Sequence, residues 1–156
     1  MRTSLLAVAL FGIICLSAAN EWSRGFGENV NWVSFEEGKK ISKETGKPQL
    51  LLIHKTWCGA CKRLKGSFSD DSAVVALQDH FVMSNVEDDE EPQEDEFRPS
   101  GSGYIPRILF LENGVVRDDV FNANGNPSYK YFYPNVEAVA EGMKHALLML
   151  KKPEEL

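Results

Sequence analysis

The strands are predicted from runs of apolar residues. Residues 50–53 form a continuous apolar run and 81–86 a second apolar segment, which is typical of strands buried on both faces of a sheet. Two further runs, 107–111 and 115–121, flank Asn113-Gly114, a dipeptide that strongly favours a hairpin turn. A short strand is also expected just before Ser34. These segments predict a central sheet that includes one antiparallel hairpin.

The helices are predicted from apolar residues spaced by three and four. Ser34 is the expected N-cap of a helix over 35–45. From residue 58 the spacing predicts a helix, a break at 69–71 and a second short helix, and a final apolar stripe predicts a helix that ends before Pro153. The order of elements predicts one α/β domain, a sandwich in which helices flank a central mixed sheet.

The two ends of the sequence carry signals of the secretory pathway. A positively charged start, a short apolar run and small residues before Asn20 predict a cleaved signal peptide over residues 1–19. The alternative is a membrane anchor, but the apolar run is shorter than the roughly 20 residues that span a bilayer. The last four residues, 153–156, resemble a signal that a retrieval receptor reads. We therefore expect a domain over 20–152 in the endoplasmic reticulum lumen, with secretion as the alternative.

Charge and cysteine content narrow the function. The formal net charge of −6 at pH 7 argues against nucleic acid and against an anionic membrane as partners. Of the three cysteines, Cys15 lies in the predicted signal peptide, so the domain keeps only Cys58 and Cys61. A disulfide between residues so close in sequence adds little stability through chain entropy. The pair is therefore better explained by chemistry than by structural stapling.

Cys58 and Cys61 have the spacing of a redox-active dithiol. If Cys58 is the first residue of a helix, unpaired N–H groups and the helix dipole lower its thiol pKa from about 8.5 into the range of roughly 3.5–7.5. Cys61 then lies one turn along, close enough to close a disulfide. Cys58 is the predicted nucleophile, which forms a mixed disulfide with a client, and Cys61 the resolving thiol that releases it. Gly59 and Ala60 are small, so the backbone can turn tightly and the sulfur stays exposed.

A zinc site is the alternative use of such a pair. Structural zinc needs four ligands, and no further cysteine lies in residues 20–156. The histidines, His54, His80 and His145, are isolated in the sequence. We therefore expect no metal and no bound cofactor.

Pro106 and its neighbours are the second candidate feature. Proline is tolerated at the start of a strand, so Pro106 either marks a strand start or forms a cis bond with Ile105 opposite the cysteines. Only about 5–6% of X–Pro bonds are cis, so sequence alone supports the second interpretation weakly. Trp57 is either core or, with Tyr104 and Ile105, an exposed surface for clients. The edge before Pro106 also suits strand addition by an extended client.

Three stretches of sequence carry a resemblance to a known family: residues 53–62, 104–111 and 125–133. They are similar to motifs of the thioredoxin superfamily and, within it, of small endoplasmic reticulum oxidoreductases related to the anterior gradient proteins. The resemblance implies a thioredoxin-like three-layer sandwich, Cys58 as nucleophile, Cys61 as resolving cysteine and Pro106 as cis-proline. It also implies protein-disulfide reductase or oxidase activity on protein clients, with glutathione as redox partner.

One position departs from the pattern of that superfamily. Many members carry a buried acid six residues before the first cysteine as a proton relay, and this position is Leu52. Proton transfer to or from Cys61 then needs water, Lys55 or another group. Lys55 is a candidate for stabilising the thiolate, although a solvated lysine at the end of a strand is the favoured interpretation.

A second class of function is a client-binding or folding-escort protein, as among the anterior gradient relatives, in which the cysteines are secondary. Two intact cysteines favour the enzyme. The eight acids of the segment 87–96 predict an exposed, solvated loop. Weak calcium binding is the alternative, although the segment lacks the ligand spacing of an EF-hand.

Overall fold

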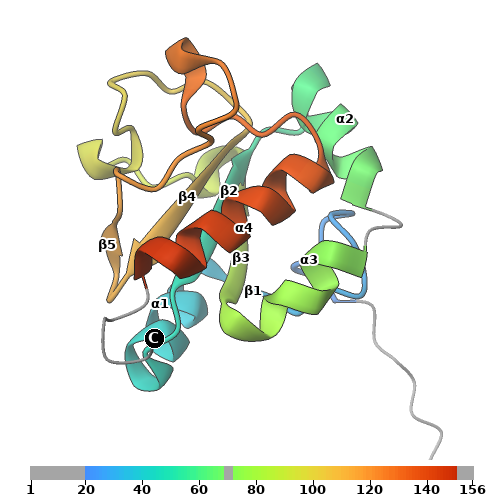
Figure 1. Ribbon diagram of the computed structural model, residues 1–156. Coiled ribbons are helices and arrows are strands. Elements are labelled where there is room, and N and C mark those ends of the chain that lie inside the picture. The colour runs from blue at the N-terminus through green and yellow to red at the C-terminus, as the bar shows by residue number, and fades with distance from the viewer. Residues whose placement is uncertain (1–19, 69–71, 151–156) are drawn as a thin grey trace, which may run out of the picture.

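Five strands form the central sheet of the computed structural model, which describes residues 20–68 and 72–150 (Figure 1). In chain order the strands are β1 (Trp32–Val33), β2 (Gln49–His54), β3 (Val82–Glu87), β4 (Arg107–Glu112) and β5 (Val115–Val116). Across the sheet they run β1-β3-β2-β4-β5, with β2 parallel to β3 and antiparallel to β4. The cysteine pair lies just after the end of β2, the central strand of the sheet.

Four helices flank the sheet: α1 (Phe35–Thr45), α2 (Gly59–Phe68), α3 (Ser72–Leu77) and α4 (Val136–Leu150). Helix α1 begins as predicted, because the Ser34 side chain accepts the N–H of Glu37 at 3.2 Å. It ends at Gly46, whose φ of 72° is a left-handed conformation that glycine adopts without steric cost.

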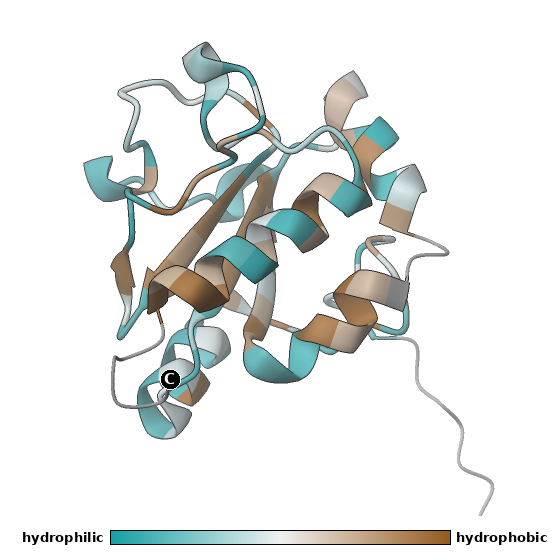
Figure 2. Ribbon diagram, in the orientation of Figure 1, coloured by the Kyte–Doolittle hydropathy of each residue, from teal (hydrophilic) through white to brown (hydrophobic). Residues whose placement is uncertain are grey.

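Both faces of the sheet are covered, because successive residues of β2 point to opposite sides. Leu50 and Leu52 belong to a core with residues of α2, α3 and α4, and α4 crosses this face of the sheet in Figure 1. Leu51 and Ile53 belong to a second core, which α1 and the loops before β4 and after β5 cover. Figure 2 shows the apolar strands between polar outer surfaces, as a three-layer α/β sandwich requires.

The structure confirms the predicted fold class, the buried central strand, the β4–β5 hairpin and the final helix. The predicted strand over 115–121 is wrong beyond Val116. A turn in which the Val120 N–H donates to the Arg117 carbonyl at 3.1 Å ends the pairing. That turn directs Val120 into the core beside α4, so burial of one side chain outweighs continued strand pairing.

Some predictions fall on parts of the chain outside the described residues. These are the signal peptide over 1–19, the break at 69–71, the helix stop at Pro153 and the tail 153–156. Within residues 20–68 and 72–150, none of the helices has the length and apolar character that a membrane crossing needs.

Candidate redox site

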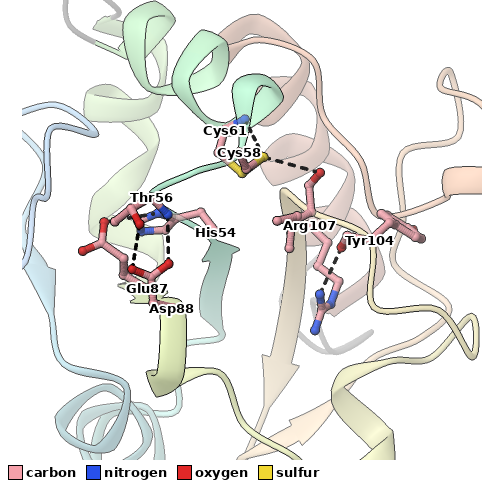
Figure 3. The surroundings of a disulfide bond; sticks show 9 residues. His54, Thr56, Cys58, Cys61, Glu87, Asp88, Tyr104 and Arg107 are labelled. Atoms are coloured by element: carbon pink, nitrogen blue, oxygen red, sulfur yellow. Dashed lines mark hydrogen bonds and ion pairs between the residues drawn. A yellow bond between two sulfur atoms is a disulfide. The ribbon is translucent and has the colours of Figure 1, made fainter.

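Cys58 and Cys61 are joined in a disulfide at the junction of β2 and α2, with their Cα atoms 5.2 Å apart (Figure 3). The prediction that Cys58 is the first helical residue is wrong by one position, because α2 begins at Gly59. The carbonyl of Cys58 accepts the N–H of Lys62 at 3.1 Å, which makes Cys58 the N-cap. The N–H of Cys61 donates to Cys58 Sγ at 3.0 Å. A helix N-terminal donor therefore points at the sulfur of Cys58, as the chemistry of a thiolate requires.

The two cysteines differ in access to solvent. Cys58 is 6% exposed and Cys61 1% exposed. Gly59 is exposed and Ala60 is half-buried. The predicted exposure of the Cys58 sulfur is nevertheless wrong for the disulfide form, because the residue as a whole is buried. A reagent arriving from solvent reaches Cys58 before Cys61, which is the order that an attacking and a resolving thiol require.

The segment before β4 faces this disulfide. The Ile105–Pro106 peptide bond is cis, and the carbonyl oxygen of Ile105 lies 3.9 Å from Cys58 Sγ. Pro106 is buried, whereas Tyr104 and Ile105 are half-buried. The ring of Tyr104 meets that of Tyr129 edge to face, with centroids 5.1 Å apart. The fold thus brings together the two features, far apart in sequence, that were singled out separately.

Trp57 lies on the outside of this site. Its residue is 72% exposed, the largest exposure among the big apolar side chains of the described residues. It directly precedes Cys58, so an apolar surface stands beside the sulfur with no core neighbours to bury it. An exposed aromatic ring of this kind is typical of a contact surface for a partner.

Lys55 is not the solvated lysine that the sequence favours. Its ammonium pairs with the Glu91 carboxylate at 2.8 Å and donates to the Asp88 carbonyl, and its side chain is only 18% exposed. The acidic residues that follow β3 in sequence fold back against the end of β2. The contact with Glu91 therefore holds the Lys55 ammonium against the protein and reduces its exposure to solvent. Support of the thiolate by Lys55 stays a prediction.

The acidic segment 87–96 is an ordered part of the site and not one exposed loop. Glu87 ends β3, and short 3-10 turns cover 88–90 and 95–97. The carboxylate of Asp88 accepts the backbone N–H and the hydroxyl of Thr56 at 2.9 and 2.8 Å, just before the cysteines (Figure 3). These two hydrogen bonds lower the pKa of Asp88. The remaining acids of the segment include several exposed side chains, as expected.

Glu91 is the residue of this segment that sequence reasoning missed. It is 8% exposed, and its carboxylate pairs with Lys55, Arg98 and Arg107. Burial raises the pKa of Glu91, but hydrogen bonds from Lys55 and Arg107 outweigh it and leave the pKa below its usual range. The available signal was Arg107 at the start of an apolar strand, because a buried guanidinium requires a buried acceptor.

His54 is a second residue that the sequence did not single out. It ends β2 and is 1% exposed, and its ring lies 4.7 Å from that of Phe26. Its Nε2 lies 3.2 Å from the Asn85 side-chain oxygen, and its Nδ1 lies 3.6 Å from the Glu87 carboxylate. Burial lowers the pKa of His54 to about 4, although the hydrogen bond to Asn85 opposes this. The imidazole is therefore neutral at physiological pH.

A mixed sheet that carries a cysteine pair at the start of a helix, opposite a cis-proline, defines a thioredoxin-like dithiol–disulfide protein. The family model described as Thioredoxin-like matches residues 31–113, more than half of the sequence, and the chain belongs to this family. The family resemblance that the motifs carry is thereby confirmed.

Anterior gradient proteins are among the known relatives that this chain resembles. It is 34% identical over 131 residues to anterior gradient protein 2 of Xenopus tropicalis, covering 83% of this chain and 78% of that protein. It is 30% identical to the anterior gradient protein 2 homolog of Homo sapiens, covering 83% of this chain and 73% of that protein. Among solved structures, a thioredoxin from Thermus thermophilus matches 74% of this chain and 86% of its own, with a TM-score of 0.50 and 20% identity. That structure shares the fold.

Proposed function

We propose that this protein is a thiol–disulfide oxidoreductase that exchanges disulfides with protein clients through Cys58 and Cys61. The observation that carries the proposal is the disulfide itself. It lies at the N-terminus of α2, with the Cys61 N–H aimed at Cys58 Sγ and the cis Ile105–Pro106 segment facing it. This arrangement provides an ionisable sulfur, a second sulfur within bonding distance and a backbone edge for a client.

In the reducing direction, the Cys58 thiolate attacks one sulfur of a client disulfide. The client S–S bond breaks, a mixed disulfide forms, and the departing client thiolate takes up a proton. The Cys61 thiolate then attacks Cys58 Sγ, releases the second client thiol and forms the Cys58–Cys61 disulfide. Two electrons pass from the protein dithiol to the client, and oxidation of a client dithiol runs the same steps in reverse.

Three residues around the sulfur are proposed to hold the client. Trp57 offers an exposed ring beside Cys58, and Tyr104 and Ile105 form the half-buried edge that precedes Pro106. An extended client strand that bonds to this edge would place its own sulfur near Cys58, because the Ile105 carbonyl lies 3.9 Å from Cys58 Sγ. Recognition through backbone groups suits a broad range of clients.

Glutathione is the proposed partner that restores the working redox state, and the endoplasmic reticulum lumen the proposed location. Two glutathione molecules reduce the Cys58–Cys61 disulfide and leave as glutathione disulfide. Support for the location comes from the signal-like residues 1–19 and the tail 153–156, which a retrieval receptor would read.

The decisive experiment replaces one cysteine at a time. In Cys61→Ser the mixed disulfide has no resolving thiol. We therefore expect covalent adducts with glutathione, or with a client that carries a disulfide, to accumulate on non-reducing gels. Cys58→Ser removes the nucleophile and is the matched control, for which we expect few adducts. If neither variant alters insulin reduction or adduct formation, the proposed function is refuted.

A second function is favoured by the similarity to anterior gradient proteins and by the exposed Trp57. In this alternative the protein holds unfolded clients without exchanging their disulfides. The double variant Cys58→Ser/Cys61→Ser separates the two functions. If it still suppresses aggregation of a cysteine-free unfolded client, binding is independent of the dithiol.

A further inference from the structure

The Glu91 carboxylate joins two segments that border the disulfide. Its Oε2 pairs with Lys55 at 2.8 Å, and its Oε1 pairs with Arg107 and with Arg98, the latter at 3.1 Å. Lys55 follows β2, Arg107 begins β4, and Glu91 lies in the segment after β3. One buried carboxylate therefore connects the turn that carries Cys58 to the segment before β4 that contains Pro106.

Lys55 connects Glu91 to the nucleophile through the backbone. The Lys55 carbonyl accepts the N–H of Cys58 at 3.3 Å, so both ends of this short turn are fixed. Next to it, the carboxylate of Asp88 holds Thr56 by two hydrogen bonds. The turn that carries Cys58 is thus attached to the segment after β3 at two places, one of which is Glu91.

Arg107 connects Glu91 to the client edge. It directly follows Pro106, and its side chain is 1% exposed. Its guanidinium donates to the carbonyls of Tyr104 and Phe97, at 3.0 Å each, in addition to Glu91. The planar guanidinium uses separate N–H groups for these acceptors, so its orientation fixes the backbone of the segment before the cis bond.

We propose that Glu91 is a positioning residue that sets the distance between Cys58 Sγ and the client-binding segment 104–106. It acts on both sides at once, through Lys55 on the turn of Cys58 and through Arg107 behind Pro106. This inference rests on the proposed function, because the segment 104–106 must bind clients for its distance from the sulfur to matter.

A role in positioning predicts a different result from a role in stability alone. When the segment 104–106 shifts relative to Cys58, a bound peptide presents its disulfide in the wrong place, whereas a small disulfide that needs no such segment still reacts. Misplacement by about 1 Å is enough to change a rate by one to two orders of magnitude. Loss of stability without displacement leaves both substrates unaffected as long as the protein is folded.

The test compares Glu91→Gln and Lys55→Met with the control Glu94→Gln, which neutralises an exposed acid of the same segment. Two substrates are used, a peptide with one disulfide and the small aromatic disulfide 5,5′-dithiobis(2-nitrobenzoate). For the peptide we expect kcat to fall about tenfold in Glu91→Gln and in Lys55→Met, with KM changing by less than about twofold. For the small disulfide we expect rates within about twofold of wild type, and Glu94→Gln should match wild type with both substrates.

The two variants should also be coupled. Both variants break the Lys55–Glu91 pair, although Lys55→Met also removes the hydrogen bond from Lys55 to the Asp88 carbonyl. The double variant should therefore lower kcat for the peptide by less than the product of the two single effects. Lys55→Met keeps the Glu91–Arg107 pair, so it carries the test if Glu91→Gln does not fold. An unchanged kcat for the peptide in folded variants, or equal losses with both substrates, would overturn the proposal. A wild-type protein that reduces neither substrate would instead refute the proposed function.

Discussion

Acidification should destabilise the folded protein through His54. The ring is 1% exposed, lies against Phe26 and has Asn85 as its hydrogen-bond partner. Burial lowers its pKa from 6.5 to about 4. Because the folded-state pKa lies below the unfolded one, the unfolded chain takes up the proton first as the pH falls. The contribution of His54 is therefore complete above about pH 6.5 and is lost progressively down to about pH 4.

The size of this effect follows from the shift in pKa. A difference of one pKa unit corresponds to about 1.4 kcal/mol, so a decrease from 6.5 to about 4 corresponds to roughly 3 kcal/mol of unfolding free energy. The groups that surround the ring act in both directions. Arg24 and Lys65 disfavour the imidazolium, whereas Asp88 favours it.

The assay is urea unfolding of the oxidised protein at several pH values between about 7 and about 4, for wild type and for His54→Gln. The carboxylates, Glu91 among them, are present in both proteins, so the difference between the two profiles isolates His54. We expect wild type to lose roughly 3 kcal/mol more than the variant over this range. Parallel profiles would refute the reasoning, and would mean that the Glu87 carboxylate, 3.6 Å from Nδ1, stabilises the imidazolium despite its burial.

Three further substitutions test separate parts of the structure. Trp57→Ala should weaken client binding about thirtyfold, as measured by peptide titration, while unfolding free energy changes by less than about 0.5 kcal/mol, because the ring is exposed. Ser34→Ala removes the N-cap of α1 and should cost about 1 kcal/mol in urea unfolding without changing insulin reduction; a fall in reduction rate would contradict this. Phe97→Ala opens a cavity under the acidic segment and should cost about 3–5 kcal/mol, and a loss below about 1 kcal/mol would show that Phe97 is not core.

Local signals in the sequence were enough to predict most of the fold. The run 50–53 predicts a buried strand, because four adjacent apolar residues in a strand place apolar side chains on both faces of the sheet. The structure buries all four. Asn113-Gly114 predicts the hairpin because both residues tolerate positive φ, and their φ values are 53° and 83°. Strand β5 is short for a reason outside its own sequence, since the core beside α4 takes Val120.

The candidate site was predicted only where its residues are adjacent in sequence. Cys58 and Cys61 can be recognised as a redox pair from their spacing, whereas the cis bond at Pro106 was predicted from the family resemblance. Glu91 is one acid among many in its segment, and nothing in its neighbours indicates that it alone is buried. Its partners, Lys55 and Arg107, are distant in sequence, and only the folded chain brings them to the same carboxylate.

The two outermost strands of the sheet, β1 and β5, are each two residues long. Long unpaired strands invite other chains to join them, which is a hazard for any protein surrounded by nascent, unfolded polypeptides. Because its edge strands are this short, the sheet offers other chains few unpaired backbone groups with which to form intermolecular strand pairs. If the segment 104–106 binds clients as proposed, extended polypeptide is accepted beside Cys58, while the short edges of the sheet disfavour aggregation with it.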